Sequence, residues 1–408
     1  MGPGTVCAAR GGDGVTPGRR AGAGGALDVG VFGARGIPST YSGYETFLTT
    51  LLPRLADRGH RVTMYCRAGE VRGATPYEGV RRVVLPAVPG KSLNTLSHGA
   101  VAAVRARAAR HDVLLVVNVA NAPICLVNTG SGQPVLLNTD GQEWLRGKWG
   151  RRARAYFHFA ARHAGRCATG LVSDCAAMAR LYEDDFGAPS TVIPYCFPAP
   201  SFTPDRSVPA AFGVEEGGFF VIAGRLNPEN NIDAVAAAYA ASAVPLPLLV
   251  LGVANYDSPV QRRLDEIAAA DDRIRLGGHV GDRPTFLSLL ATAAAYLHAH
   301  SVGGMNPSLV EAMGAEALVV ALDTPFNRET LGDAGCYFAA GCGDVADVLS
   351  AVRSASGAER SRLRSAAGRR VRERFGVEDV VDAYEEALRA TAGAGRRRGV
   401  RLPTRWGP

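Results

Sequence analysis

The stretch YLHAHSVGGMNPSLVEAMGAEALVVALDTPFNRE, residues 296–329, carries the strongest structural signal in the chain. Its apolar start predicts a short buried strand that ends near His300, followed by a glycine-bearing loop over 301–306. A helix is predicted from Pro307, and a second apolar strand over 317–322 leads into a polar loop. This strand, loop, helix and strand order is typical of a parallel α/β fold.

The start of the predicted helix has the features of an anion site. Asn306 is a favoured N-cap residue and Pro307 a favoured first helical residue. Unpaired N–H groups and the helix dipole at such a start both favour a phosphate. Glu311 lies one turn further along, where a carboxylate can accept the hydroxyls of a sugar or ribose. We therefore expect a phosphorylated ligand that is rich in hydroxyl groups.

The distribution of charge argues against a dedicated nucleic-acid binder. The chain has 408 residues, enough for two domains, a net charge of +7 and a pI near 9.1. Residues 1–26 carry a net charge of +2 and the tail 391–408 a net charge of +5, so the region 27–390 is formally neutral. A neutral body lacks the basic surface that nucleic acids require.

Cysteine spacing and hydropathy point to a cytosolic protein. The eight cysteines show no CxxC spacing and lie mostly in apolar segments, which favours buried, reduced thiols. The N-terminal residues are rich in glycine and lack the apolar run of a signal peptide. No apolar run reaches the roughly 20 residues that a spanning helix needs. We expect a protein that is cytoplasmic or bound peripherally to the inner membrane face.

Strand and helix patterns alternate before residue 194. This alternation is typical of a parallel sheet covered by helices on both faces. Strands are predicted at 27–33, 61–66, 82–85, 113–117, 135–138, 170–173 and 191–193, and helices at 44–58, 95–110, 146–166 and 174–186.

The alternation restarts after a proline-rich linker, predicted at 195–209. The chain should thus form two Rossmann-like domains, 27–194 and 210–376, whose parallel sheets face each other across a cleft. A closing helix is expected at 377–390, with disordered segments at 1–26 and 391–408. Ligands of such sheets bind at the carboxyl ends of the strands, which places the site in the cleft. The further strands are predicted at 219–224, 247–252, 273–278 and 294–299, and the further helices at 231–241, 258–270, 284–293, 344–354 and 358–374.

The first strand runs into the loop GARGIPSTYSGYETF, residues 33–47. Gly33 and Gly36 allow close approach of a ligand, and the loop feeds a helix start. A plain strand-to-helix turn would need the same glycines. A nicotinamide site is less favoured, because the loop lacks GxGxxG and the next strand ends in Arg67 instead of an acidic residue. The side chains here that favour a ligand are Arg35, Tyr41 and Glu45.

The segment AGRLNPENN, residues 223–231, follows the first strand of the second half. Arg225 is placed at the carboxyl edge of that strand, where it can pair with a diphosphate. The alternative is a surface ion pair between Arg225 and Glu229. Asn230 and Asn231 would then only cap the next helix.

The segment NTDGQEW, residues 138–144, is a polar loop after a buried strand of the first half. Asp140 and Glu143 should project toward the cleft, although an Asx turn at Asp140–Gly141 is the simpler reading. No Asp-x-Asp pair lies at a strand end, so we predict no metal site. Neutralisation of a diphosphate would then depend on Arg225 and on helix N-termini.

The segment 145–166 is basic and carries interleaved aromatic residues. A helix of this kind can lie on an anionic membrane face. We favour instead a helix whose aromatic side chains pack on the sheet while its arginines are solvated, because the aromatics approach a helical stripe. The basic residues are Arg146, Lys148, Arg151, Arg152, Arg154, Arg162 and Arg166.

These motifs, in this order, resemble the retaining nucleotide-sugar glycosyltransferases of family 4, which have the GT-B fold. The chain is most similar to a bacterial subgroup that has rhamnosyltransferases among its members. That subgroup shows GxRGIPxxYGGFETF-like, DGxEWxRxKW-like and HSVGGxNPSLxEAM-like segments. Here they read GARGIPSTYSGYETF, DGQEWLRGKW and HSVGGMNPSLVEAM. The likeness extends from Leu27 to about Ala390.

The resemblance implies roles for individual residues. The donor would lie against the second half, with Glu311, the second Glu of the family's E-x7-E motif, on the ribose and Arg225 on the diphosphate. Asp140 falls near the position of an active-site histidine in many members, so Asp140, Arg225 and Glu311 are the expected catalytic residues. The expected donor-binding residues are Gly33, Gly36, Arg225, Asn230, Gly303, Gly304, Asn306, Ser308 and Glu311, and those of the opposing loops are Arg35, Tyr41, Glu45 and Glu143.

Two positions depart from the wider family. Gly303 stands where the first Glu of E-x7-E usually touches the donor sugar, and Asn230 stands where a lysine usually accompanies the arginine. Both departures imply altered donor contacts, so the sugar is left open, with rhamnose compatible.

The resemblance implies an enzyme that moves a sugar from a UDP- or dTDP-sugar to an acceptor hydroxyl, with retention and without a metal. No cofactor is expected beyond the nucleotide sugar. The acceptor would be a glycan, a lipid-linked glycan or a small molecule, and nucleic acid is not an expected partner. The alternatives are a nucleotide-sugar epimerase of the same fold and a non-catalytic GT-B partner protein.

Overall fold

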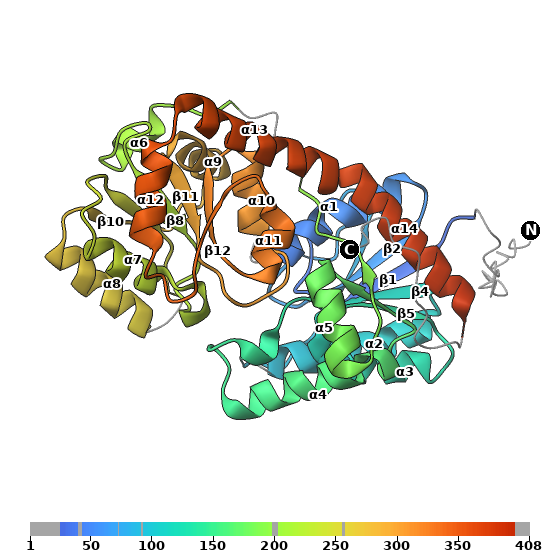
Figure 1. Ribbon diagram of the computed structural model, residues 1–408. Coiled ribbons are helices and arrows are strands. Elements are labelled where there is room, and N and C mark those ends of the chain that lie inside the picture. The colour runs from blue at the N-terminus through green and yellow to red at the C-terminus, as the bar shows by residue number, and fades with distance from the viewer. Residues whose placement is uncertain are drawn as a thin grey trace, which may run out of the picture.

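The computed structural model of the chain contains two parallel β-sheets, each covered by helices, and the two lobes lie side by side (Figure 1). The structure describes residues 25–39, 43–71, 73–90, 93–197, 203–254 and 258–395. Tyr41, most of the lead 1–26, part of the linker 195–209 and most of the tail 391–408 lie outside the described residues. The predicted α/β class with two parallel sheets is confirmed.

The first sheet has seven strands in the order β3-β2-β1-β4-β5-β6-β7. Its strands are β1 (Asp28–Phe32), β2 (Arg61–Arg67), β3 (Arg81–Leu85), β4 (Val113–Val117), β5 (Val135–Asn138), β6 (Gly170–Ser173) and β7 (Thr191–Val192). Its helices are α1 (Gly43–Asp57), α2 (Leu93–Ala109), α3 (Leu126–Thr129), α4 (Arg151–Cys167) and α5 (Ala176–Phe186). The central strands β4, β5 and β6 are buried along their whole length, because helices cover both faces.

The second sheet has six strands in the order β10-β9-β8-β11-β12-β13. Its strands are β8 (Phe220–Ala223), β9 (Leu248–Leu251), β10 (Ile274–Gly278), β11 (Ala295–His298), β12 (Val319–Leu322) and β13 (Cys336–Phe338). The helices of this part are α6 (Val208–Ala211), α7 (Ile232–Ala240), α8 (Pro259–Ala270), α9 (Arg283–Thr292), α10 (Pro307–Gly314), α11 (Pro325–Leu331), α12 (Val345–Ser354), α13 (Gly357–Arg374) and α14 (Val377–Ala394).

Both sheets wind outward in two directions from a central strand. In the first sheet β1 pairs with β2 and β4, and in the second β8 pairs with β9 and β11. Loops that leave neighbouring strands at such a switch point diverge, and ligands bind between them. The loops after β1, β5, β8 and β11 are those that the sequence selects as candidate sites.

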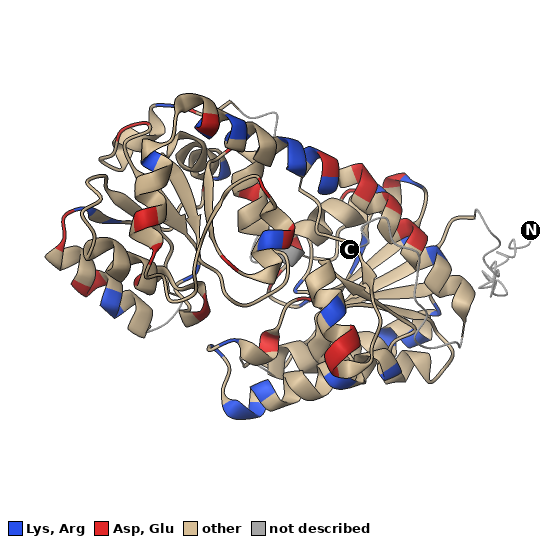
Figure 2. Cartoon of the chain, viewed as in Figure 1, with Lys and Arg blue, Asp and Glu red and all other residues tan. Residues whose placement is uncertain are grey.

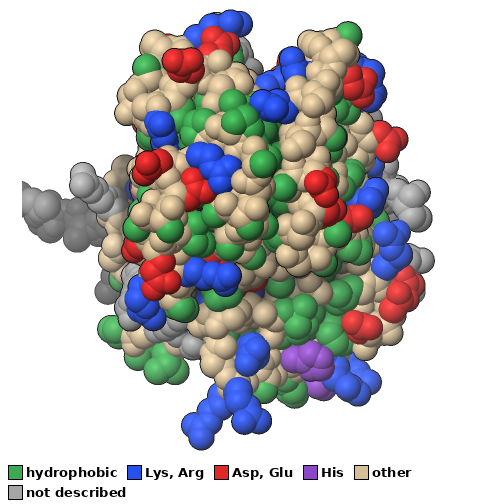
Figure 3. All heavy atoms as spheres, turned by 60° about the vertical axis from the view of Figure 1, so that its left-hand side comes forward, with side chains coloured by type: hydrophobic (Ala, Val, Ile, Leu, Met, Phe, Trp, Pro, Cys, Tyr) green, Lys and Arg blue, Asp and Glu red, His purple; other side chains and the backbone are tan. Residues whose placement is uncertain are grey.

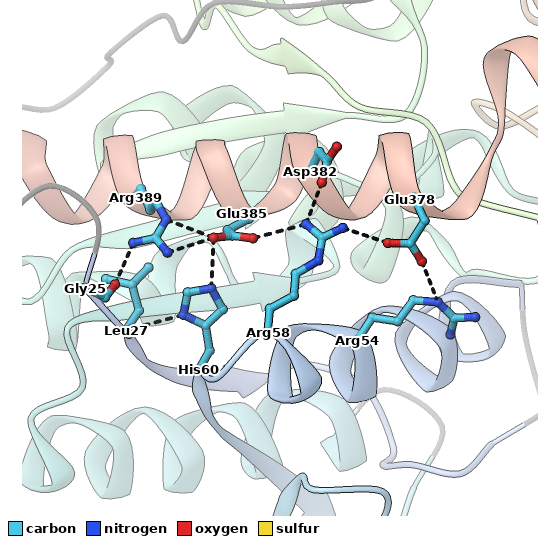
Figure 4. A network of polar contacts seen from close by, with 9 residues as sticks. All are labelled: Gly25, Leu27, Arg54, Arg58, His60, Glu378, Asp382, Glu385 and Arg389. Atoms are coloured by element: carbon cyan, nitrogen blue, oxygen red, sulfur yellow. Dashed lines mark hydrogen bonds and ion pairs between the residues drawn. The ribbon is translucent and has the colours of Figure 1, made fainter.

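The last helix, α14, returns to the first half of the molecule (Figure 1). It contacts α1, β4 and β5, and the Asn138 side chain donates a buried hydrogen bond of 2.7 Å to the Tyr384 hydroxyl. Acidic side chains of α14 pair with basic side chains of the first half (Figure 4). At the centre of this network Arg58 bonds to Glu378, Asp382 and Glu385. The closing helix therefore joins the two halves.

Two local predictions were wrong. The basic helix predicted from residue 146 begins at Arg151, and the preceding residues form a loop. The polar loop expected after β12 contains the helix α11, where the Thr324 hydroxyl accepts a hydrogen bond from the Asn327 N–H and Pro325 occupies the first turn. Threonine as N-cap and proline as first residue are strong start signals for so short a helix.

Candidate functional site

Two glycine-containing loops, one after β5 and one after β11, touch where the carboxyl ends of the strands of the two sheets meet. An added Cβ on Gly141, after β5, would lie 3.1 Å from the Cα atom of Gly303, after β11. A Cβ on Gly304 would overlap the carboxylate of Asp174, which follows β6. The same carboxylate accepts a hydrogen bond of 2.9 Å from the Met305 N–H. Small residues on both sides therefore allow the halves to meet here.

Asp174 and Glu329 hold this interface, and neither was predicted from the sequence. The Glu329 carboxylate accepts hydrogen bonds of 2.5 and 2.7 Å from the N–H groups of Ala176 and Ala177, at the start of α5. Asp174 is 2 % exposed, and burial, reinforced by the negative charges of Asp140 and Glu329, raises its pKa to about 7. Together the two carboxylates fix the second half against the strand ends of the first.

Asp140, the predicted catalytic residue of the first half, lies in this interface region. Its backbone is left-handed (φ 57°), and its N–H donates to the Asn138 side chain at 2.9 Å. The Asx turn is therefore formed by Asn138, not by Asp140 as the simpler reading had it. Burial, with the charge of Glu143, raises the pKa of Asp140, and the Tyr195 hydroxyl donates to its carboxylate at 3.4 Å.

Glu143 lies beside Asp140 and pairs with the two basic residues that precede α4. Its carboxylate lies 2.5 Å from Arg146 Nε and 3.2 Å from Lys148 Nζ, and it accepts a hydrogen bond of 2.7 Å from Trp149 Nε1. Burial raises the pKa of Glu143, but the two cations and their hydrogen bonds outweigh it, so the pKa is lowered. Arg146 and Lys148 are thus mostly buried at the interface, not on a solvated helix as the sequence suggested.

Arg225 occupies the predicted position after β8. It is exposed and forms no ion pair with the residues that the structure describes. The predicted alternative pair with Glu229 is therefore wrong, because the cation beside Glu229 is Arg146, at 3.9 Å. Asn230 is buried, and its side chain donates to the Arg225 carbonyl oxygen at 2.7 Å. The amide of Asn230 thus shapes the loop that presents Arg225.

His300, which the sequence did not single out, stands among these cations. Burial and the positive charges of Arg146 and Arg225 lower its pKa to about 3, so the ring is neutral at physiological pH. The ring stacks on His298 with centroids 4.4 Å apart, and His300 Nδ1 has no hydrogen-bond partner among the described residues. A neutral imidazole can donate one hydrogen bond to an anion.

Glu311, the predicted ribose carboxylate, is paired in this structure. Arg283 Nη1 lies 2.8 Å from its carboxylate, and burial raises the pKa of Glu311 against the effect of that cation. Asn306 caps α10 by position, but its side chain makes no capping hydrogen bond, in contrast to the expectation. Ser308 lies in the first turn of α10, half-buried, where the Tyr296 hydroxyl reaches its side chain.

In the loop after β1, the candidate side chains hold one another. A Cβ on Gly33 (φ 107°) would overlap the Val117 carbonyl oxygen, so glycine is required by the fold there. A Cβ on Gly36 (φ 147°) would lie 2.6 Å from the Val71 side chain and 3.1 Å from that of Cys66. The fully buried Glu45 accepts hydrogen bonds from the Arg35 N–H at 3.0 Å and from the Ser39 hydroxyl at 2.9 Å. Arg35 and Glu45 therefore shape the loop.

The electrostatics of the interface favour an anion. Burial lowers the pKa values of Lys148 and His300, and the charges of Arg146 and Arg225, from opposite halves, lower both further, although Glu143 raises that of Lys148. The positive fields of the two arginines therefore overlap at these groups. Glu143 pairs with Arg146 and Lys148, and Glu229 lies 3.9 Å from Arg146, whereas Arg225 has no ion-pair partner among the described residues. The arrangement suits a small, highly charged anion such as a diphosphate.

The described residues offer no metal centre and no membrane-spanning helix. No group of three or more His, Cys, Asp or Glu side chains there could hold a metal ion. No helix in the described ranges has the length and apolar composition needed to cross a bilayer.

Two protein-family models match the chain. A "Glycosyl transferase 4-like domain" matches residues 42–196, and "Glycosyl transferases group 1" matches residues 218–356. None of the curated proteins matches the chain in sequence.

The fold is similar to several solved structures. HepE from Anabaena, in complex with UDP, has a TM-score of 0.68 at 15 % identity over 89 % of this chain and 100 % of that chain. Sucrose-phosphate synthase from Thermosynechococcus elongatus has a TM-score of 0.75 at 16 % identity over 90 % and 100 %. A glycosyltransferase from Rickettsia africae has a TM-score of 0.68 at 12 % identity over 90 % and 98 %. The chain has the GT-B fold, and its two domain matches support a glycosyltransferase.

Proposed function

We propose that the protein transfers a sugar from a UDP- or dTDP-sugar to an acceptor hydroxyl, with retention and without a metal ion or cofactor. The observation that carries this proposal is the cluster of Arg225, Arg146 and Lys148 between two glycosyltransferase-like domains, with the neutral His300 beside the two arginines. The similar HepE has been solved with UDP and with UDP-glucose, which favours a nucleotide-sugar donor. The sugar would be a hexose or a 6-deoxyhexose such as rhamnose.

In this proposal the cations stabilise the leaving diphosphate. As the bond between the anomeric carbon and the β-phosphate oxygen breaks, negative charge grows on that oxygen, and positioned cations contribute most where charge develops. Arg225 from the second half and Arg146 and Lys148 from the first would surround it. Arg146 and Lys148 would then supply the positive charge that the neutral Asn230, at the position of the family's lysine, does not supply.

The remaining residues would orient the two substrates. The acceptor oxygen attacks the face that the diphosphate leaves, and its proton passes to a departing phosphate oxygen. Asp140, close to the interface, would orient the acceptor or offset the positive charge of the sugar. Glu311 would bind the ribose hydroxyls in exchange for its bond to Arg283. The contacts of Asp174 and Glu329 would keep the halves together and exclude water.

Binding and turnover assays test the proposal. A thermal-shift screen with UDP, dTDP, GDP and their sugars should show stabilisation by at least one of them, since a ligand of the native state raises its stability. Arg225→Ala and Glu311→Ala should each reduce turnover at least tenfold. The matched controls are Arg206→Ala and Glu216→Ala, which remove an exposed ion pair between the linker and the second half. Wild-type turnover in both site variants would refute the assignment.

The same assays separate the alternatives. A nucleotide-sugar epimerase would convert the donor without an acceptor, which NMR of the product from donor alone detects. A non-catalytic partner protein would show no turnover with any donor and acceptor pair.

We further place the enzyme in the cytoplasm, with a lipid-linked acceptor for glycan biosynthesis at the inner membrane face. The support is α4, whose outward face is basic and carries no acidic residue (Figure 2). Basic and histidine side chains gather at the lower edge of the molecule, at the level of α4 (Figure 3). Phe159 of α4 is 51 % exposed, which gives the basic face an apolar component. The exposed arginines of α4 are Arg151, Arg152, Arg154, Arg162 and Arg166.

A further inference from the structure

Glu229 is a buried carboxylate without hydrogen bonds. Its side chain is 3 % exposed, and neither carboxylate oxygen has a hydrogen-bond partner among the described residues. Among the described residues, Glu229 forms an ion pair with Arg146 Nη1, at 3.9 Å, which is beyond hydrogen-bond distance. Buried polar groups in folded proteins are nearly always hydrogen-bonded, and a charged group has the greatest need. Glu229 therefore requires a partner that supplies hydrogen-bond donors.

The position of Glu229 is fixed by the loop after β11. Glu229 lies in the 3₁₀ helix η4 (Pro228–Asn230), four residues after Arg225. Its carbonyl oxygen accepts hydrogen bonds from the Ser301 N–H at 3.0 Å and from the Ser301 hydroxyl at 2.9 Å. Its carboxylate faces the first half, since a Cβ on Gly147 would lie 3.5 Å from Glu229 Oε2. The carboxylate thus stands at the interface, beside the cation cluster.

The neighbouring cation does not provide the missing donors. Arg146 Nη1 is 3.9 Å from the nearer Glu229 oxygen, and Arg146 Nε lies 2.5 Å from a Glu143 oxygen as an ion pair without hydrogen-bond geometry. The Nη2 atom lies 3.5 Å and 3.7 Å from where Cβ atoms of Gly141 and Gly303 would be. The guanidinium therefore lies between the two glycine loops, with its strongest pairing to the first half. The two oxygens of Glu229 offer only acceptor positions, so a complementary ligand must carry hydroxyl or amide donors.

We propose that Glu229 accepts hydrogen bonds from hydroxyl groups of the donor sugar and selects donors that carry them. This inference rests on the proposed function and deepens it. A sugar bound through its β-phosphate at the cations places its hydroxyls within a few ångströms of the diphosphate, where this carboxylate lies. A site built to accept hydrogen bonds from a hydroxyl discriminates strongly against a ligand that lacks it, because the buried acceptor is then left unpaired.

The test compares a nucleoside diphosphate with its sugar in the variant Glu229→Gln. The probes are UDP with UDP-glucose and dTDP with dTDP-rhamnose, measured by titration calorimetry on the full chain. The variant should bind the nucleotide sugar at least tenfold more weakly than the wild type does, while its affinity for the nucleoside diphosphate changes less than twofold. The control Glu266→Gln, an exposed carboxylate on α8, should change neither affinity.

Each outcome decides one question. If the wild type binds none of the probes, the proposed function fails first. If the wild type binds and Glu229→Gln retains full affinity for the nucleotide sugar, the carboxylate is satisfied by water and the inference is overturned. Equal losses for the diphosphate and its sugar would show that Glu229 only positions the cations, which also overturns it. Should Glu229→Gln not fold, Glu229→Asp, which keeps the charge on a shorter side chain, must show the same selective loss.

Discussion

Replacing Asp174 by asparagine should stabilise the protein above neutral pH. Asp174 is 2 % exposed and accepts a hydrogen bond from the Met305 N–H of the other half. Burial raises its pKa to about 7 from the 3.8 of a free side chain. Asparagine keeps the shape and the accepting carbonyl oxygen but carries no charge. At about 1.4 kcal/mol for each pKa unit, the difference between the folded and free pKa values of Asp174 corresponds to a gain in unfolding free energy of at most about 4 kcal/mol for the variant.

The pH dependence of this stabilisation follows from the protons that Asp174 binds in the folded and unfolded states. Because the folded pKa of Asp174 lies above the unfolded one, the stability that its protonated form contributes is complete below about pH 4 and is lost as the pH rises through 7. The advantage of Asp174→Asn in free energy of unfolding should therefore be small at pH 4 and grow until about pH 7. Urea unfolding of both proteins at half-unit steps from pH 4 to 8 measures it. A difference that does not vary with pH, or a less stable variant at pH 8, would refute the reasoning.

Three further predictions concern other contacts. Glu329→Ala removes the acceptors for two N–H groups at the start of α5, so urea unfolding should show a loss of about 1–2 kcal/mol, and an unchanged midpoint would contradict the cap. Burial raises the pKa of Glu385, but the basic side chains drawn in Figure 4 outweigh it and lower that pKa. The contribution of Glu385 to stability is therefore present above about pH 4.5 and is lost as the pH falls through the lowered pKa. Glu385→Gln should destabilise the protein at pH 7 but not in strong acid, and unfolding curves at both pH values measure this. The double variant Arg152→Gln, Arg154→Gln should bind anionic vesicles more weakly at low salt, by about 1 kcal/mol for each arginine, as cosedimentation measures. Its binding to neutral vesicles should be unchanged. Equal binding of variant and wild type to anionic vesicles would argue against α4 as the contact.

The fold could be predicted from the sequence because its strands are buried on both faces. Such strands read as continuous apolar runs, and Val113–Val117 was predicted with the same limits that β4 has. The helix α11 was missed because seven residues are too few for an apolar period to emerge. Its start signals, Thr324 and Pro325, were present and would have found it.

The composition of the site could be predicted only in part. Arg225 and Asp140 could be placed at strand ends, since a buried strand followed by a polar residue defines that position. Arg146 and Lys148 were assigned to a helix because basic and aromatic residues alternate there, although Gly147 between them argues against a helix. The contact of Asp174 with Met305 joins residues 131 positions apart and depends on how the halves dock, which no local pattern encodes.

The division of the cations between the halves has a thermodynamic consequence for the proposed site. From the described residues of the second half, Arg225 is the cation at this site, and the Asn230 amide is bonded to the Arg225 carbonyl oxygen. Arg146 and Lys148 come from the first half, and in this structure the glycine loops of the two halves touch beside the buried Asp174. Two unit charges 4 Å apart attract by about 4 kcal/mol at an effective dielectric constant of 20, so a diphosphate between the halves would favour closure by a comparable amount for each first-half cation. Above pH 7 the ionised Asp174 opposes the same closure. Donor affinity should therefore depend on the balance of these two terms, because a ligand that binds only the closed state shifts the population toward it.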